Sequence, residues 1–516
     1  MAHRLGKDYG RRLKLIKKYI PVLILLIPVF ILFYPLFFRF FSFDSFKAIF
    51  NYRTLNILYY TFIQALISAI FSLLISICPV IYLYNKKSTV ATLIESTFFI
   101  PFFFPVISTV TVFSFISRYL PINLQYSLFT VIIAHVFYNS PIYVMYLSQA
   151  VKKIPINRFE SASLETTSNL KLLFHIVIPS ISGALSRSFF LVFLFCFTSF
   201  GVLISLGNIR LSNFEIAIYQ SINTNLNISQ GLSFAIIQFV ILLAINFIIL
   251  RSKSENLEQQ SIKKNNKYQH SIIGSALFII LEFSIVFFSV TNSFFYSITR
   301  KANYFVKLFS TEFNTIFPVI IALRNTFLTA IVTSIIVTIT TYIIVRNGSR
   351  IYNIIINSFL CVSSSIISLS ILTFHIYYSV PAFLILIIGY TVLAIPLSYS
   401  FMYSHIKGIS KKILEAASVD GAGFLYSFIN IEFPLLFPIL LRNFIQIFAL
   451  IFGEFTISYI FQSGANFPLI STVHYSITSR RYLGESYALN TICVMLILFS
   501  FALSIKFSNK AEKSSL

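Results

Sequence analysis

Long apolar runs are the feature that most constrains the fold of this 516-residue chain. A helix that crosses a bilayer needs about 20 apolar residues and satisfies its backbone hydrogen bonds internally. A membrane barrel would need short segments of alternating hydrophobicity instead. The runs therefore predict an all-α integral membrane protein with about 12 transmembrane helices, at residues 19–38, 56–84, 90–117, 127–150, 182–206, 231–250, 271–291, 319–345, 353–378, 381–402, 437–461 and 485–506.

The formal net charge of +23 does not indicate a nucleic-acid-binding protein, because the cations follow membrane topology. With the amino terminus in the cytoplasm, most Lys and Arg residues lie before the first run or in loops on that side. This bias predicts a multi-pass protein of a bacterial cytoplasmic membrane with both termini in the cytoplasm. The first run is too long for a cleaved signal peptide, so we expect an anchor.

The residues that usually carry chemistry are sparse. The four cysteines lie inside apolar runs without metal-ligand or disulfide spacing, so we expect buried packing and no metal site. The chain has no G-x-x-x-x-G-K-[ST] phosphate loop. We therefore expect no cofactor and no enzymatic activity in this chain, and any ATP hydrolysis would belong to a separate subunit.

A short polar sequence occurs twice, at an offset of 255 residues (415 minus 160). Glu160 to Thr166 is followed by Ile176 and Pro179, and Glu415 to Gly421 is followed by Ile431 and Pro434. Each copy lies between two apolar runs on the positively charged side. The repeat extends to Arg187/Arg442, Phe197/Phe452 and the Thr-Phe pairs at 61–62 and 326–327. The chain is thus predicted to contain two homologous halves in parallel orientation.

These halves define the expected domain organisation. Residues 251–270 are polar and charged and lack hydrophobic periodicity, which indicates a linker. We expect a cytoplasmic amino terminus and first span at 1–55, a first repeat at 56–250, a linker with the seventh span and an external loop at 251–318, a second repeat at 319–507 and a cytoplasmic tail at 508–516.

Each polar repeat reads as two short helices joined by a turn. In the second copy, Glu415 lies early in a helix, where the helix dipole favours a negative charge. Gly421 then breaks the helix and permits a left-handed turn, and Pro434 starts the next span. Such a helix, lying along the membrane surface, is suited to transmit a push from a cytoplasmic partner.

The second copy, Glu-Ala-Ala, three residues, Gly, nine residues, Ile, one residue, Phe-Pro, resembles the "EAA" loop of permeases of binding-protein-dependent ABC importers (MetI-like). The first copy matches with Ser161 in place of Ala and Thr166 in place of Gly. In that family the loop docks on the ATP-hydrolysing subunit. The resemblance implies coupling residues at Glu160, Ala162, Glu165, Ile176, Pro179, Glu415, Ala416, Ala417, Asp420, Gly421, Ile431 and Pro434.

The same resemblance implies partners and a cargo. The partners would be an ABC ATPase subunit, as a dimer, in the cytoplasm, and a periplasmic or lipid-anchored substrate-binding protein outside. Two loops in one chain, with the stretches 134–141, 196–207 and 215–221, are similar to the thiamine and thiamine pyrophosphate permeases. A ferric-iron permease is the alternative cargo class. A secondary transporter, which also uses internal repeats, is the alternative of another kind.

Five polar residues outside the two polar repeats each allow a functional and a structural interpretation. Glu454 and its repeat partner Ser199 lie in apolar runs, where a polar group faces a watery path or makes a structural hydrogen bond. Asn139 is a candidate for the pathway or for supporting a bend at Pro141. Glu215 and Tyr219 are expected outside, either to dock a binding protein or to order a short helix.

Overall fold

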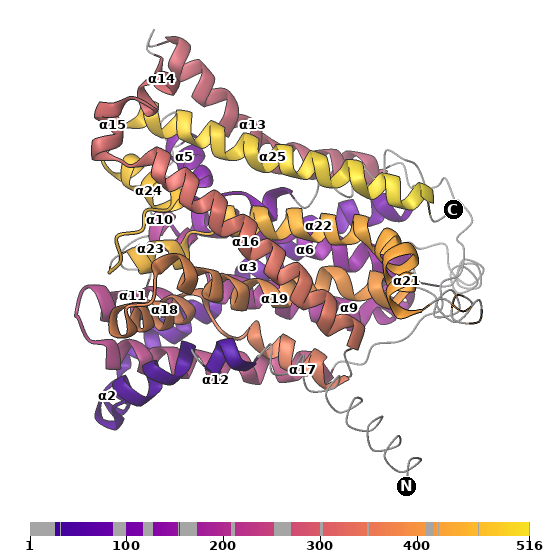
Figure 1. Cartoon of the computed structure of the whole chain (residues 1–516), viewed down its shortest axis with the longest axis horizontal. Coiled ribbons are helices and arrows are strands. Elements are labelled where there is room, and N and C mark those ends of the chain that lie inside the picture. Colours follow the sequence, from indigo (N-terminus) through magenta and orange to yellow (C-terminus); the bar gives the residue numbers. More distant parts are fainter. Residues whose placement is uncertain are drawn as a thin grey trace. The chain divides into compact units, whose positions relative to one another are not determined.

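All regular elements in the described residues of this computed structural model are helices (Figure 1). The structure describes residues 26–30, 32–85, 100–116, 127–152, 154, 173–207, 212–251, 270–299, 303–347, 350–408, 417, 419, 421, 423–462 and 464–514.

Eight of the described helices are long and apolar enough to cross a membrane. Three shorter apolar helices, Leu26–Phe40, Phe283–Tyr296 and Ser364–Tyr378, overlap further predicted runs. The prediction of an all-α, multi-pass membrane protein is thereby confirmed. The eight spans are Tyr52–Ile81, Leu128–Val151, Phe174–Phe197, Ile228–Phe247, Val319–Asn347, Ala382–Tyr403, Phe428–Gly453 and Leu483–Leu503.

The chain forms two compact units. Unit 1 contains residues 1–42, 311–473 and 496–516, and unit 2 contains residues 43–310 and 474–495. Two of the four boundaries between their segments fall inside helices, in α24 (Ile470–Ser479) and in α25 (Leu483–Ser514). The first predicted repeat thus lies in unit 2 and most of the second in unit 1.

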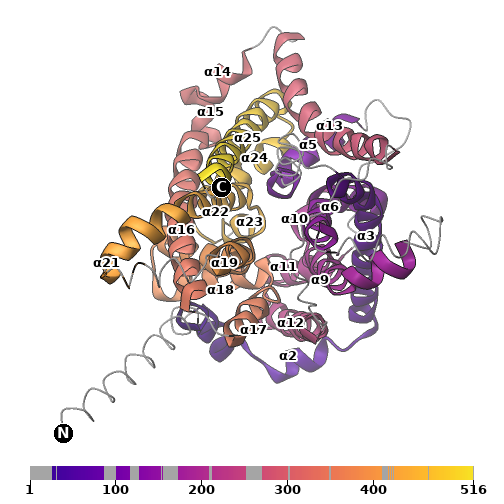
Figure 2. The ribbon, with the colours of Figure 1, turned by 90° about the vertical axis from the view of Figure 1, so that its right-hand side faces the viewer.

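Unit 2 is centred on α6 (Leu128–Lys152), which packs against α3 (Tyr52–Asn85) and α9 (Ile178–Phe197) (Figure 2). A stripe of small and hydroxyl residues on α3 is fully buried, which lets the two helices approach closely. The other helices of the unit are α2 (Phe43–Ala48), η1 (Ile100–Phe103), α5 (Val106–Ile116), η2 (Leu173–Val177), α10 (Gly201–Leu206), α11 (Phe214–Asn223), α12 (Ile228–Arg251), α13 (His270–Thr299) and α14 (Tyr304–Leu308).

Unit 1 repeats this arrangement with α16 (Val319–Asn347), α19 (Ala382–Gly408) and α22 (Phe433–Gly453) in mutual contact. The amide of Asn443 on α22 joins all three, because it donates to Thr338 Oγ1 of α16 at 3.0 Å and to Ser398 Oγ of α19 at 2.9 Å. The other helices are α15 (Thr311–Ile316), α17 (Arg350–Phe359), α18 (Ser364–Tyr378), α21 (Phe424–Ser427), η3 (Phe428–Glu432) and α23 (Thr456–Gln462).

Four predicted spans are interrupted, which corrects their assignment as continuous helices. The run 90–117, described from Ile100 to Ile116, divides into η1 and α5 at Phe104–Pro105. The run 182–206 divides into α9 and α10 at Thr198–Phe200, and the run 437–461 divides into α22 and α23 at Glu454–Phe455. The run 353–378 divides into α17 and α18, where the Ser363 hydroxyl accepts from the Ile366 N–H and caps α18. Apolar composition does not reveal the breaks at Thr198–Phe200 and at Glu454–Phe455, because the residues on both sides of each are mostly apolar.

Candidate functional site

The two polar repeats are the first candidate for a functional site, and the structure describes their ends. Glu160, Ala162 and Glu165 of the first copy and Glu415, Ala416 and Asp420 of the second lie outside the described residues. Ala417 is buried at 7% exposure. Ile176, Pro179, Ile431 and Pro434 are all described, so the exit from each repeat into its span can be compared.

Both exits have the same local structure. Ile176 lies in the π-helix η2 and Ile431 in the π-helix η3. Each π-helix leads directly into a long span that carries a proline at its second residue, Pro179 or Pro434. Proline has no N–H, so the helical hydrogen-bond ladder is interrupted at the same place in both copies. The predicted equivalence of the two segments is therefore reproduced in the backbone.

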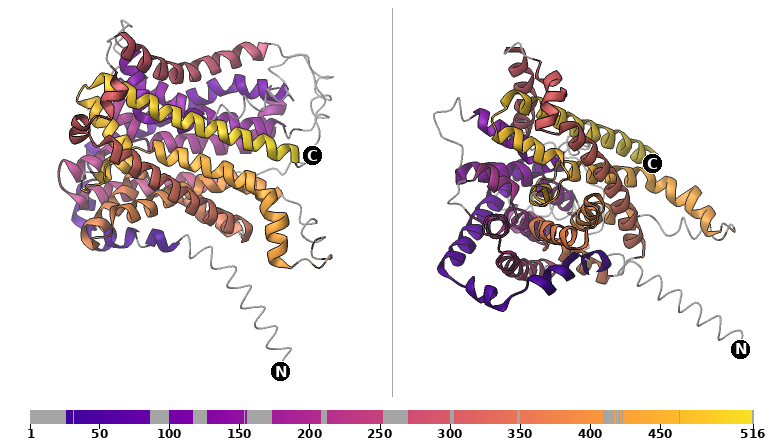
Figure 3. Two further views of the ribbon diagram at one scale, coloured as in Figure 1. Left: turned by 45° about the horizontal axis from the view of Figure 1, so that its top comes forward. Right: turned by 60° about the vertical axis from the view of Figure 1, so that its left-hand side comes forward.

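Gly421 adopts the left-handed conformation that the sequence predicts. Its φ angle is +79°, and a Cβ atom at this position would meet no atom within 4 Å. The strain that a larger residue would feel there is therefore in the backbone alone. Farther along, α21 and η3 turn away from the axis of α22 (Figure 3, left).

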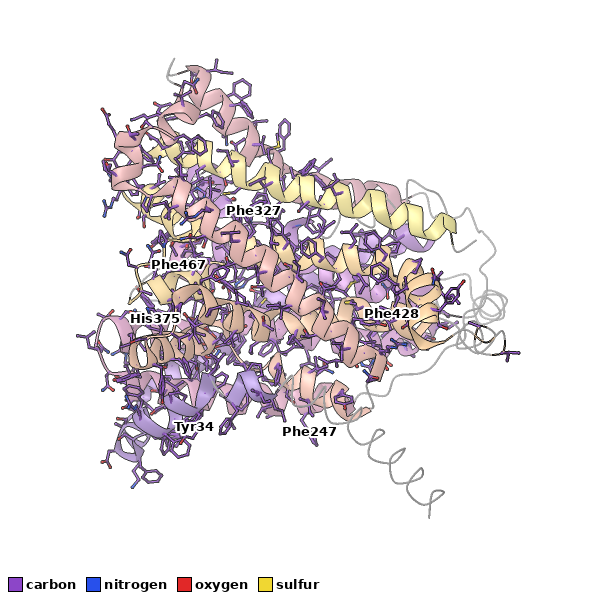
Figure 4. All side chains as sticks on the ribbon, viewed as in Figure 1. Tyr34, Phe247, Phe327, His375, Phe428 and Phe467 are labelled. Atoms are coloured by element: carbon purple, nitrogen blue, oxygen red, sulfur yellow. The ribbon has the colours of Figure 1, made fainter. Side chains whose placement is uncertain are left out.

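A charged cluster at the second exit was missed by sequence reasoning. Glu432, 5% exposed, receives an ion pair from Arg346 (Nη2 to Oε2, 2.6 Å) and a hydrogen bond from the Tyr342 hydroxyl (2.8 Å). Arg346 also donates to that hydroxyl at 3.0 Å and lies over the ring of Phe428. In Figure 4, the labels of Phe327 and Phe428 lie near opposite ends of α16. We call these residues, Tyr342, Arg346, Phe428 and Glu432, the Glu432 cluster.

The signal that could have found the cluster is a lone acid among apolar residues. Glu432 is the one charged residue between Phe424 and Leu441, and Arg346 closes the long apolar run of α16. A buried carboxylate needs a partner of opposite charge. Their pairing could not be read from the sequence because the two residues are separated by several helices.

Glu454 was a candidate for the pathway, and the structure gives its carboxylate a local role. Both of its oxygens accept from the Ile457 N–H at 3.0 Å, and Oε2 also accepts from the Ser458 N–H at 3.3 Å. Glu454 thus caps the amino terminus of α23, whose first amides have no intrahelical acceptor. Its role in a pathway stays a prediction.

Ser199 and Asn139 also make structural contacts. The Ser199 carbonyl accepts from the side chain of Asn213, which caps α11. The Asn139 amide donates to the His135 carbonyl at 2.9 Å and to Cys196 Sγ at 3.4 Å. Asn139 therefore connects α6 to the end of α9, as expected for a polar residue between helices.

Glu215 and Tyr219 lie on α11, and both help to hold it in place. Glu215 is fully buried and accepts from the Gln238 amide of α12 at 2.5 Å. The half-buried Tyr219 packs its ring against Phe200 at 5.3 Å. The geometry favours the ordering of a short helix, and docking of a partner at these residues stays a prediction.

An ion pair joins α14 to the first turn of α25. Lys307 Nζ lies 2.6 Å from Glu485 Oε1, and the hydrogen bond to Glu485 raises the pKa of Lys307. Gly484 faces the ring of Tyr304 so closely that a Cβ atom would overlap it at 2.3 Å. Among the described residues, no group of three His, Cys, Asp or Glu side chains is placed to hold a metal ion.

Each repeat contains an equivalent hydrogen bond made by the threonine of its Thr-Phe pair, which supports the sequence match of these pairs. Thr61 Oγ1 accepts from the N–H of Phe214, the first residue of α11, at 3.3 Å. Thr326 Oγ1 accepts from the N–H of Ile470, the first residue of α24, at 2.8 Å. A matched ring contact accompanies it, because Phe62–Phe193 and Phe327–Phe448 are both edge-on at 5.2 Å.

Comparison with known proteins agrees with this architecture. Residues 345–513 match the family described as "Binding-protein-dependent transport system inner membrane component". The chain is 24% identical over 225 residues to the thiamine transport system permease protein ThiP of Haemophilus influenzae, which covers 41% of each chain. It is 34% identical over 110 residues to the probable ABC transporter permease protein YesP of Bacillus subtilis, covering 20% of this chain and 36% of that protein.

A third relative is the thiamine transport system permease protein ThiP of Brucella abortus, 30% identical over 125 residues, covering 24% of this chain and 23% of that protein. The matches span less than half the length of each of these relatives. The family match falls on the second predicted repeat and contains the Glu432 cluster member Arg346. The chain therefore resembles the permeases of binding-protein-dependent ABC importers, with the family match over residues 345–513.

Proposed function

We propose that this chain is the membrane-spanning subunit of a binding-protein-dependent ABC importer of the MetI type. The observation that carries the proposal is the pair of matched exits, each a π-helix followed by a span with proline at its second residue. Such a segment follows each EAA-like sequence, so the chain has two equivalent places where a cytoplasmic ATPase dimer would dock. The family match over the second repeat supports the same reading.

The cargo that we propose is thiamine or its phosphate esters. Two of the relatives are named thiamine transport permeases, and the stretches 134–141, 196–207 and 215–221 resemble that group. Ferric iron is the other cargo class that a two-loop chain suggests. In this proposal a substrate-binding protein delivers the cargo from outside, and the chain itself catalyses no reaction.

The proposal places the chain in a bacterial cytoplasmic membrane with both termini inside. ATP binding and hydrolysis on the separate subunit would set one state of the pathway, and the loaded binding protein would favour the other. Each of them shifts the equilibrium only through its different affinity for the two states.

The test is the ATPase activity of this chain, purified with its ATPase subunit in lipid nanodiscs. Addition of the thiamine-loaded binding protein is expected to stimulate hydrolysis, and the same protein loaded with ferric iron is expected to leave it unchanged. Stimulation by iron alone would overturn the cargo and keep the class. Failure to co-purify with any ATPase would favour a secondary transporter.

A further inference from the structure

The Glu432 cluster connects two elements that are far apart in the sequence. Glu432 is the last residue of η3 and directly precedes Phe433, where the span α22 begins. Tyr342 and Arg346 lie in the last two turns of α16. The ion pair at 2.6 Å and the Tyr342–Glu432 hydrogen bond at 2.8 Å therefore join the exit of the second polar repeat to the end of a different span. The hydrogen bond from Arg346 to the Tyr342 hydroxyl, at 3.0 Å, lies within α16 and orients both side chains.

The burial of Glu432 makes this connection hard to break. A carboxylate at 5% exposure that lost its cation would remain as an uncompensated charge among apolar residues. Any displacement of η3 is therefore expected to move the end of α16 with it. The ring of Phe428 adds a second contact between the same two elements, because it lies 6.3 Å from the Tyr342 ring and 5.8 Å from the Arg346 guanidinium.

The first repeat carries no polar residue at the three positions that correspond to Glu432, Tyr342 and Arg346. Position 177 corresponds to Glu432 at the 255-residue offset and is Val. The Thr61/Thr326 match sets an offset of 265 (326 minus 61) between α3 and α16, which places Ile77 and Ile81 opposite Tyr342 and Arg346. All three positions are aliphatic, so η2 and the end of α3 cannot form an ion pair there.

We propose that Glu432 and Arg346 are positioning residues that make η3 and the end of α16 move as one body, so that the second loop transmits movement to two spans. This inference rests on the proposed function for its physiological meaning. It assigns the two loops unequal roles: the second loop acts on α22 and α16 together, and the first loop acts on α9 with aliphatic residues at the three positions that correspond to Glu432, Tyr342 and Arg346.

The first experiment needs neither ATPase nor cargo. Hydrogen exchange is measured on the purified full chain in lipid nanodiscs, for the native protein and for Glu432→Gln, which keeps the size of the side chain and removes its charge. Exchange at residues 424–432 and in the last turn of α16 is expected to rise together, by about fivefold or more. A rise in only one of the two segments, or in neither, would overturn the inference.

Three further variants separate positioning from general destabilisation. The charge exchange Arg346→Glu with Glu432→Arg is expected to restore at least part of the native protection in both segments. Tyr342→Phe should produce a smaller rise in the same two places. Lys307→Met removes an ion pair of the same 2.6 Å length in unit 2 and should leave residues 424–432 unchanged. A uniform rise along α16, α19 and α22 in Glu432→Gln would indicate a merely structural role and overturn the inference.

The second experiment measures coupling in the complex with its ATPase. The stimulation of hydrolysis by thiamine-loaded binding protein is expected to fall about fivefold or more in Glu432→Gln, while basal hydrolysis stays near the native rate. Unchanged stimulation would overturn the role in coupling. Absence of stimulation in the native complex would count against the proposed function, and the exchange results would still decide whether the two segments move together.

Discussion

The repeat built on α3, α6 and α9 and the repeat built on α16, α19 and α22 share a framework but differ in the polar groups attached to it. In both, a threonine on the first helix accepts the first amide of a later short helix, and a π-helix and a proline introduce the third helix. The first repeat buries Gln64 and Asn139, and its buried carboxylate, Glu215, is held by the amide of Gln238. The second buries a carboxylate at Glu432 and uses another, Glu454, as a cap.

This difference shows which positions the architecture requires. A helix that starts inside a membrane protein must find acceptors for its first amides, so Thr61 and Thr326 fill the same role in both halves. Charged groups are not required by the architecture, because the first repeat is built without them at positions 177, 77 and 81. The charges of the second repeat are therefore the better candidates for a task specific to that half.

The largest effect is expected when charge reversal in the second loop is compared with charge reversal in the first. Glu415→Lys places a cation where the sequence predicts a helix amino terminus, a place that favours negative charge, and should reduce uptake about tenfold or more. Glu160→Lys should reduce it less, because the first loop lacks the glycine turn and the Glu432 cluster. Uptake by cells with matched amounts of membrane-inserted protein measures both. An equal loss in the two variants would contradict the unequal roles, and full activity of Glu415→Lys would exclude its coupling role.

A smaller effect is expected on the free energy of unfolding when the side chains of Glu454 and Ser199 are removed in turn. Glu454→Ala removes the acceptor for the amides of Ile457 and Ser458 and should lower the free energy of unfolding by about 1–2 kcal/mol. Ser199→Ala keeps the backbone carbonyl that binds Asn213, so its effect should stay within about 0.5 kcal/mol. Thermal unfolding followed by circular dichroism provides the comparison. If Glu454→Ala leaves the unfolding midpoint unchanged and abolishes transport, the carboxylate serves the pathway instead of the helix.

The smallest expected effect tests the shared framework. Thr61→Val and Thr326→Val each remove the acceptor for the first amide of a short helix and should each cost about 1 kcal/mol. The two threonines share no partner, so the double variant should show the sum. The same thermal unfolding measures all three proteins. A clearly larger cost at one site would mean that the two hydrogen bonds are not equivalent in the two repeats.

Much of the fold could be predicted from local sequence. The long runs at 56–84, 127–150, 231–250, 319–345 and 381–402 correspond to α3, α6, α12, α16 and α19, because length and apolar composition suffice to define a membrane helix. The left-handed turn at Gly421 and the starts of α9 and α22 beside Pro179 and Pro434 also followed from residue type.

The interruptions at Glu454 and at Thr198–Phe200 could not be predicted from apolar length or residue type. The break at Glu454 depends on a carboxylate that caps a new helix, and the break at Thr198–Phe200 precedes α10 without a side-chain cap. Both segments are as apolar as an unbroken span, so a hydropathy window cannot detect them. The fully buried position of Glu215 was likewise outside the reach of the sequence, since its partner Gln238 lies on the next helix.

The sequence by itself determined that the chain is an all-helical membrane protein with two homologous halves, because apolar length, charge bias and the 255-residue offset are properties of residue order alone. Only the tertiary structure decided which polar groups meet. Arg346 and Glu432 are 86 residues apart (432 minus 346), and their ion pair exists because the end of α16 packs beside η3. Such pairing depends on the three-dimensional approach of helices, and spacing along one helix carries no information about it.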